Sequence, residues 1–186
     1  MRRSACVIAG SDYLAEYARQ VGAVRVIKIP STVKSHPFRA SYRDLTDKIT
    51  FVWIGSPSTR QYLEMLRPVL SSLENRPWCE FWIIGAEARD FLPRLNGNIR
   101  FFEWSEATQY KVLSRADIGL MPLPDSEFER GKCAYKLIQY MSCGLALAAS
   151  PVGENKVVVQ DGISGIFFES PPCDPSTRWR PSPAPW

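Results

Sequence analysis

Short apolar runs alternate with helix-like segments along this chain, and the alternation limits its possible folds more than any other feature. The runs are apolar along their whole length, which is typical of strands buried on both faces of a sheet. Helices that follow such strands join parallel neighbours and cover both faces. The sequence therefore predicts an α/β fold with a doubly wound parallel sheet. The predicted strands are residues 5–10, 24–30, 49–55, 79–85, 98–104, 117–123, 145–150 and 165–169, and the predicted helices are 12–22, 59–75, 87–95, 105–116 and 131–143.

The pattern divides the chain into three parts. A polar stretch near residues 31–47 interrupts the alternation and is typical of a linker, so residues 1–47 are predicted to form a first unit with that linker. Residues 48–169 form the main domain. Residues 170–186 contain six prolines and no periodicity, which predicts a disordered tail. Since an α/β sheet normally closes with a helix and none remains here, we expect either that the chain is truncated or that its end encodes something unlike the rest.

Composition excludes several classes of partner. The chain has 186 residues and a formal net charge of +4. Its lysines and arginines are scattered along the sequence, which favours a small anionic ligand over nucleic acid. No apolar run approaches the roughly 18–20 residues that span a bilayer. One histidine and five cysteines show no spacing typical of a metal site. We therefore expect no metal, and reduced thiols in the cytoplasm.

Two predicted strand ends have the form of an anion site. In "WIGSPSTR", Gly55 ends a strand and Ser56 leads into a helix, with Arg60 close by. The unpaired N–H groups and the dipole of a helix start favour a negative charge. The alternative is that these residues serve the geometry of the turn alone. Gly153 in "SPVGEN" marks a second junction of this kind, whereas Gly85 after the neighbouring strand is a weaker signal.

The stretch "ERGKCAYKLIQYM", residues 129–141, is not a Walker loop. Ser126 and Cys133 stand where that loop needs a glycine and a Ser or Thr. If the stretch is helical, Lys132, Lys136, Gln139 and Cys143 share a stripe about 60° wide, and the other side, suited to burial, comprises Cys133, Ala134, Leu137, Ile138 and Met141. Two cations near a helix start are favoured once a polyanion is present, and a solvated lysine face is the alternative. Together with the strand ends, the stripe predicts a diphosphate held by lysines and backbone amides without metal.

These motifs occur in an order that resembles a known family. The segments "VWIGSPSTRQYLEML", "FWIIGAE" and "RGKCAYKLIQYMSCGLALAASPVGEN" are similar to the donor-binding, C-terminal half of family 4 glycosyltransferases, which have the GT-B fold. The resemblance runs from about residue 49 to 168. It implies a Rossmann-like domain and an enzyme of polysaccharide biosynthesis that transfers a sugar from a UDP- or GDP-linked donor to an acceptor hydroxyl, with retention and without metal or other cofactor. Residues 4–40 resemble the last strands of the acceptor-binding half, so residues 1–47 would be its remnant and the linker.

The resemblance also implies roles for single residues. Lys132 and Lys136 would be catalytic, because they would neutralise the phosphates of the leaving group. The residues expected to bind the donor are Gly55, Ser56 and Arg60 at the diphosphate, the backbone near Trp104 at the base, and Gly153, Glu154 and Asn155 at the sugar or phosphates.

The sequence departs from the family at its acidic residues. Many members carry two glutamates separated by seven residues, and Gly131 and Gln139 occupy those positions here. Gln139 is expected to hydrogen-bond a ribose hydroxyl, while Glu127 and Glu129 are only weak substitutes for the missing acids. Lys34 stands where the linker usually has an acidic residue.

Because most of the acceptor half is missing, we expect the isolated chain to be inactive. The implied partners are a nucleotide sugar and a glycan or lipid-linked acceptor, with a location in the cytoplasm or peripheral to the inner membrane face. Two other hypotheses stay open. In the first, the chain is a non-catalytic remnant or a subunit that needs a partner. In the second, it is a sugar-nucleotide epimerase of similar fold.

Overall fold

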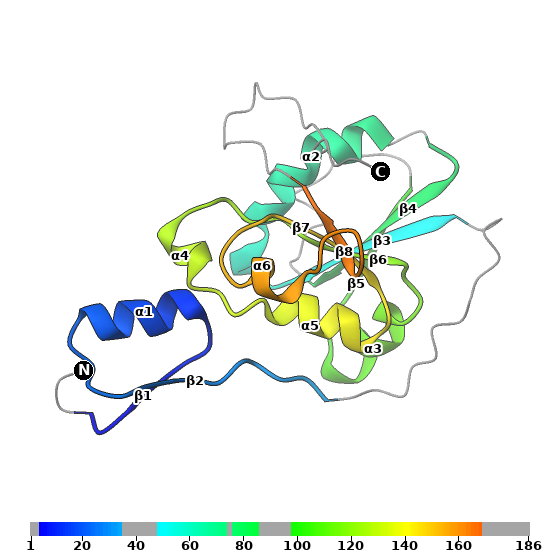
Figure 1. Ribbon diagram of the computed structural model, residues 1–186. Coiled ribbons are helices and arrows are strands. Elements are labelled where there is room, and N and C mark those ends of the chain that lie inside the picture. Colours follow the sequence, from blue (N-terminus) through cyan, green and yellow to red (C-terminus); the bar gives the residue numbers. More distant parts are fainter. Residues whose placement is uncertain (1–3, 35–47, 74–75, 86–97, 169–186) are drawn as a thin grey trace.

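A computed structural model describes residues 4–34, 48–73, 76–85 and 98–168 of the chain. Its main feature is a six-stranded, wholly parallel sheet in the order β5-β4-β3-β6-β7-β8, accompanied by a two-stranded parallel sheet of β1 and β2 (Figure 1). The strands are β1 (Val7–Ala9), β2 (Val26–Lys28), β3 (Ile49–Gly55), β4 (Cys79–Gly85), β5 (Ile99–Phe102), β6 (Ile118–Met121), β7 (Ala146–Ala149) and β8 (Gly165–Phe167). The helices are α1 (Asp12–Gln20), the short 3-10 helix η1 (Pro57–Thr59), α2 (Gln61–Leu73), α3 (Glu106–Leu113), α4 (Glu127–Arg130), α5 (Tyr135–Ser142) and α6 (Asn155–Val158).

The strand order confirms the predicted doubly wound sheet. The chain enters the main sheet at its centre in β3, moves outward through β4 and β5, and then returns to the other side of β3 with β6, β7 and β8. The direction of winding thus reverses between β3 and β6. In open parallel sheets, this switch point is where ligands bind, beyond the carboxyl ends of the strands.

Helices cover both faces of the main sheet, with α2 on one side and α3 and α5 on the other (Figure 1). Alternate residues of β3 serve the two sides, because successive side chains of a strand point to opposite faces. Trp53 packs with Leu63 and Leu66 of α2, whereas Val52 and Ile54 pack in the cluster that holds Leu137 and Tyr140 of α5. This two-sided burial is the reason that the strands are apolar along their whole length.

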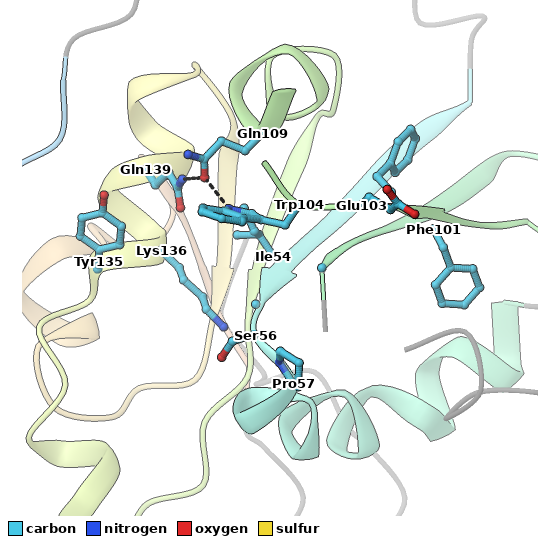
Figure 2. Close-up of a pocket in the computed structure, with 13 residues that line it drawn as sticks. Ile54, Ser56, Pro57, Phe101, Glu103, Trp104, Gln109, Tyr135, Lys136 and Gln139 are labelled. Atoms are coloured by element: carbon cyan, nitrogen blue, oxygen red, sulfur yellow. Dashed lines mark hydrogen bonds between the residues drawn. The ribbon is translucent and has the colours of Figure 1, made fainter. Parts of the chain in front are cut away.

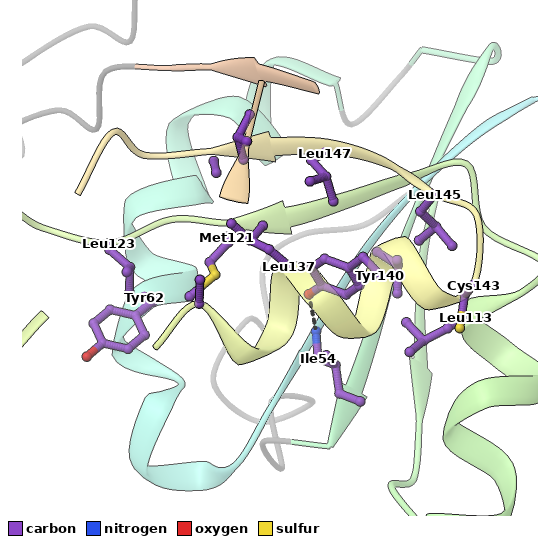
Figure 3. Packing of buried hydrophobic residues seen from close by; sticks show 14 of the residues in the cluster. Ile54, Tyr62, Leu113, Met121, Leu123, Leu137, Tyr140, Cys143, Leu145 and Leu147 are labelled. Atoms are coloured by element: carbon purple, nitrogen blue, oxygen red, sulfur yellow. Dashed lines mark hydrogen bonds between the residues drawn. The ribbon is translucent and has the colours of Figure 1, made fainter. Parts of the chain in front are cut away.

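Tyr140 joins the two strands at the switch point, and Figure 3 shows its bond to Ile54. β3 and β6 pair only at Phe51–Ile118 and Val52–Gly119. Beyond these pairs, the buried hydroxyl of Tyr140 accepts a hydrogen bond from the N–H of Ile54 at 3.2 Å and donates to the carbonyl of Leu120 at 3.1 Å. The ring needs a glycine below it, since a Cβ on Gly119 would lie 2.3 Å from it. One side chain therefore replaces the missing ladder bonds.

The local predictions hold best where capping or strand patterns are strong. β3 and β4 have the predicted bounds, and Ser11 and Ser105 cap α1 and α3 by accepting hydrogen bonds from backbone N–H groups. α2 contains Pro68 in its interior. The predicted helix 87–95, the tail 170–186 and most of the linker lie outside the described residues.

The single helix predicted over residues 131–143 is wrong in its first third. The chain forms α4, turns through residues 131–134 with Ala134 in the left-handed region at φ 52°, and begins α5 only at Tyr135. The buried side also differs, because Gln139 and Cys143 are buried and Met141 is 44% exposed. The later start and the packing of α5 against the sheet and Leu113 of α3 decide which residues face inward.

No helix within the described ranges is long and apolar enough to cross a membrane.

We predict that Tyr140→Phe lowers the free energy of unfolding by about 1–3 kcal/mol, because it leaves a buried N–H and a buried carbonyl without a partner. Urea denaturation measures the change. Tyr17→Phe, the same substitution at a half-exposed site of α1, is the matched control. Equal losses for the two variants would show that the bridge does not stabilise the sheet.

Candidate functional site

A pocket of about 840 Å³ opens at the carboxyl ends of β3, β4 and β5, beside the start of α5 (Figure 2). It lies next to the switch point of the sheet, where an α/β fold is expected to bind a ligand. Its lining combines strand ends, a turn and one face of α5. The lining residues are Ile54, Gly55, Ser56, Pro57, Gly85, Phe101, Phe102, Glu103, Trp104, Gln109, Tyr135, Lys136 and Gln139.

Two glycines form the floor at the ends of β3 and β4. A Cβ on Gly55 would lie 2.2 Å from the ring of Trp53. Gly85 has a φ of +73°, and a Cβ there would lie 2.5 Å from the carbonyl of Gly55. The glycines thus leave the backbone bare, and Ser56 stands at the rim with its hydroxyl 2.9 Å from that of Ser58.

Lys136 reaches into the pocket from the first turn of α5 towards Ser56 (Figure 2). Its ammonium lies 4.3 Å from the centroid of the Trp53 ring. Burial, followed by repulsion from Lys132, lowers the pKa of Lys136 to about 7. Among the described residues, no carboxylate forms an ion pair with it. Within the described ranges, the pocket therefore holds a cation that lies against an aromatic face and has no counter-charge.

Lys132 lies beside the pocket and does not line it. Its ammonium contacts the rings of Phe128 and Tyr62, at 4.6 and 5.0 Å from the centroids. Because α5 begins at Tyr135, the two lysines do not share a helical stripe as expected, although their charges still interact. The N–H groups of Tyr135 and Lys136, at the positive end of α5, donate to no group in the described part of the chain.

Apart from the exposed Glu103, the other end of the pocket carries uncharged side chains. Trp104 and Gln139 both donate hydrogen bonds to the side-chain oxygen of Gln109, at 3.0 and 2.8 Å (Figure 2). Gln109 and Gln139 are buried, whereas Trp104 is about half exposed. The pocket is thus polarised along its length, with a cation and bare amides at one end and an aromatic ring with two amide side chains at the other.

The structure brings five of the eleven predicted site residues to this pocket, namely Gly55, Ser56, Trp104, Lys136 and Gln139. Arg60 is exposed at the end of η1 and is not a lining residue. Gly131 faces the first unit, since its carbonyl accepts a hydrogen bond from the Ser11 hydroxyl at 3.3 Å. Gly153 lies against the backbone of Arg130, where a Cβ would approach to 2.6 Å.

Glu154 and Asn155 hold neighbouring segments together. Glu154 is 6% exposed, and its carboxylate lies 2.6 Å from the ammonium of Lys28 and accepts a hydrogen bond from the N–H of Asp12. This contact ties the β1-α1-β2 unit to the main domain. The buried amide of Asn155 donates to the carbonyl of Ser150.

Glu129 is also hydrogen-bonded within the protein. It is buried, and its carboxylate accepts hydrogen bonds from the hydroxyls of Tyr62 and Ser126. Burial, followed by the hydrogen bond to Glu129, raises the pKa of the Tyr62 phenol to about 12. Glu129 does not line the pocket.

Several lining residues carried no signal in the sequence. Gln109 is one polar residue inside a predicted helix, and Tyr135 and Phe101 belong to ordinary amphipathic segments. Only the tertiary arrangement of α3, α5 and the strand ends brings them to one pocket.

Comparison with solved structures shows the same fold. HepE from Anabaena, in complex with UDP-glucose, has a TM-score of 0.69 at 13% identity, with 91% of this chain and 51% of that chain covered. A glycosyltransferase from Rickettsia africae gives 0.68 at 13%, with 90% and 49% covered. The lipopolysaccharide outer core galactosyltransferase WaaB gives 0.65 at 12%, with 88% and 48% covered.

The chain therefore spans about half the length of these structures. No curated protein sequence matches it significantly. A family model described as glycosyl transferases group 1 matches residues 48–177, well over half of the chain. The predicted GT-B resemblance is confirmed, and the chain belongs to the group 1 glycosyl transferases.

Proposed function

We propose that this chain is the donor-binding half of a glycosyltransferase and that its pocket takes a nucleotide diphosphate sugar. One observation carries the proposal: the ammonium of Lys136, without an acidic partner among the described residues, lies in the pocket beside the bare N–H groups at the start of α5. A cation held without a counter-charge is favoured once a polyanion arrives. A diphosphate supplies that charge at the required place.

In this proposal, the diphosphate lies between Ser56, Lys136 and the first turn of α5. The bond between the sugar carbon and the phosphate oxygen breaks, and its electron pair stays on the phosphate. Lys136 and the helix N–H groups stabilise this developing charge, and Lys132 adds its field from beside the pocket. The oxygen of the acceptor hydroxyl then forms the new bond to the sugar carbon, and its proton passes to the departing phosphate oxygen. We propose that the transfer proceeds with retention and without metal.

The nucleoside then lies at the neutral end, with the base near Trp104 and the ribose near Gln139. Since HepE, which shares the fold, is solved with UDP-glucose, UDP is the first nucleotide to test and GDP the second. Contact of Glu154 with the sugar would require it to leave Lys28, because the two are paired in this structure. We likewise propose that the donor is contacted by Arg60, Gly131, Gly153 and Asn155.

The acceptor is proposed to be a glycan or a lipid-linked sugar. We place the protein in the cytoplasm or at the inner face of the membrane, where such acceptors are made. Because the chain spans about half of the similar structures, we expect donor binding by the isolated chain without transfer.

We predict that UDP or GDP at tenfold above its Kd raises the Tm by about 3–6 °C. The double variant Lys132→Ala/Lys136→Ala should lose this rise, because it removes both charges at the diphosphate end. Differential scanning fluorimetry measures the shift. Lys111→Ala/Lys156→Ala, which removes two exposed lysines, is the control with the same net charge. A wild-type chain whose Tm responds to neither nucleotide would overturn the proposed function.

The affinity for UDP should fall as the pH rises from 7 to 9. The pKa of Lys136 in the free protein is about 7, so its ammonium is lost over this range, and a bound diphosphate must restore the proton. The fall should approach roughly tenfold per pH unit, since the phosphates themselves are already ionised, with a last pKa of about 6.

Isothermal titration calorimetry at three pH values measures this slope. Lys136→Arg keeps its charge throughout, so its affinity should be nearly independent of pH. The same slope in both chains would show that Lys136 does not contact the diphosphate.

A further inference from the structure

At the neutral end of the pocket, three side chains are joined by hydrogen bonds. The indole N–H of Trp104 and the amide N–H of Gln139 both donate to the side-chain oxygen of Gln109 (Figure 2). Gln109 is 8% exposed and Gln139 is 4% exposed, yet both line the pocket. Two buried amides at a ligand pocket are unusual enough to require an explanation.

The donors and acceptors of these three side chains fix the direction of both hydrogen bonds. An indole N–H can only donate, so Gln109 must turn its oxygen, and not its nitrogen, towards Trp104. Gln139 meets the same oxygen at 2.8 Å and must therefore present its amide nitrogen. Trp104 thus determines the orientation of both amides, including that of Gln139, which it does not contact.

This orientation leaves two groups for a ligand. The amide nitrogen of Gln139 donates to Gln109 and also hydrogen-bonds the phenol of Tyr110, whose pKa burial raises and this bond lowers. The oxygen of Gln139 lies on the Lys136 side of the amide in Figure 2. The nitrogen of Gln109 donates to no described group. Buried polar groups nearly always have partners, so this acceptor and this donor at the pocket wall point to a bound molecule.

We propose that Gln109 is a positioning residue that, held by Trp104, turns the oxygen of Gln139 towards the nucleoside. The inference rests on the proposed function and deepens it. The oxygen of Gln139 receives a hydrogen bond from a ribose hydroxyl, and the nitrogen of Gln109 donates to an oxygen of the nucleoside. Both contacts are neutral, and the charge of the donor is met only at the far end of the pocket.

The same geometry accounts for the absence of a glutamate at position 139. A carboxylate there would place an oxygen against the oxygen of Gln109, at the 2.8 Å now occupied by an N–H···O bond. Gln109 could relieve the repulsion only by rotating its amide, and it would then lose the bond to Trp104. Gln109 and Gln139 are therefore a matched pair.

The test exchanges glutamine for glutamate at each position in turn and measures UDP binding by calorimetry at pH 8. Q109E should bind within about threefold of the wild type, because a carboxylate accepts both N–H groups. Q139E should bind at least roughly tenfold more weakly, because its carboxylate places one acceptor against another, the side-chain oxygen of Gln109. Equal losses in the two variants would overturn the proposal.

A double-mutant cycle tests the role of Trp104. W104F keeps an aromatic ring but removes the N–H, so Gln109 becomes free to turn its nitrogen towards a carboxylate at position 139. If W104F and Q139E acted independently, their fold-losses in UDP affinity would multiply. We expect W104F/Q139E to bind at least about threefold more tightly than that product. Repulsion between the new carboxylate and the diphosphate occurs with and without W104F and cancels in the cycle. Losses that simply multiply would contradict a path through Gln109.

Two further measurements separate this inference from the proposed function. The loss in Q139E should shrink at pH 5.5, where a protonated acid can donate to Gln109, and the loss in the control Q139M should not. The same cycle is read without nucleotide as changes in Tm. If no chain binds UDP or GDP, the proposed function fails, and coupling or additivity in Tm still decides whether Trp104 orients Gln139 through Gln109.

Discussion

The hydroxyl of Tyr140 is the contact on which the rest of the site depends. It bridges β3 and β6 where these strands stop pairing, so the sheet can open at its switch point without leaving buried backbone groups unsatisfied. The same residue belongs to α5, and its ring fits over Gly119. Its position therefore sets where α5 lies on the sheet and, with α5, where Lys136 and Gln139 enter the pocket.

The pocket keeps its cation apart from its neutral hydrogen-bonding groups. Lys136 lies at one end against an aromatic ring and bare N–H groups, and this costs the free protein stability, because a buried cation has a lowered pKa. At the other end, Trp104, Gln109 and Gln139 use neutral hydrogen bonds only. The acidic residues with buried carboxylates nearby, Glu129 and Glu154, are instead used for internal contacts. This division suits a ligand that is anionic in one part and uncharged in another.

Contacts of the first unit explain why part of the predicted site lies elsewhere. Gly131 and Glu154 meet Ser11, Asp12 and Lys28, so these positions join β1-α1-β2 to the main domain. In sequence, each of them has the same appearance as a ligand-binding residue, namely a glycine or an acid after a strand. Side-chain chemistry alone does not distinguish a ligand from a neighbouring segment that offers the same cation and N–H groups.

The sequence by itself determined the class of fold, the bounds of β3 and β4, the caps at Ser11 and Ser105, and the presence of Gly55, Ser56 and Lys136 at a strand-end site. These follow from local periodicity and from the rule that parallel strands end at one edge. Only the tertiary structure decided the start of α5 after a left-handed Ala134, the burial of Gln139, and the meeting of Gln109 with Trp104. Helical spacing fixes angles around one axis, whereas these features depend on how separate elements pack, which no local pattern encodes.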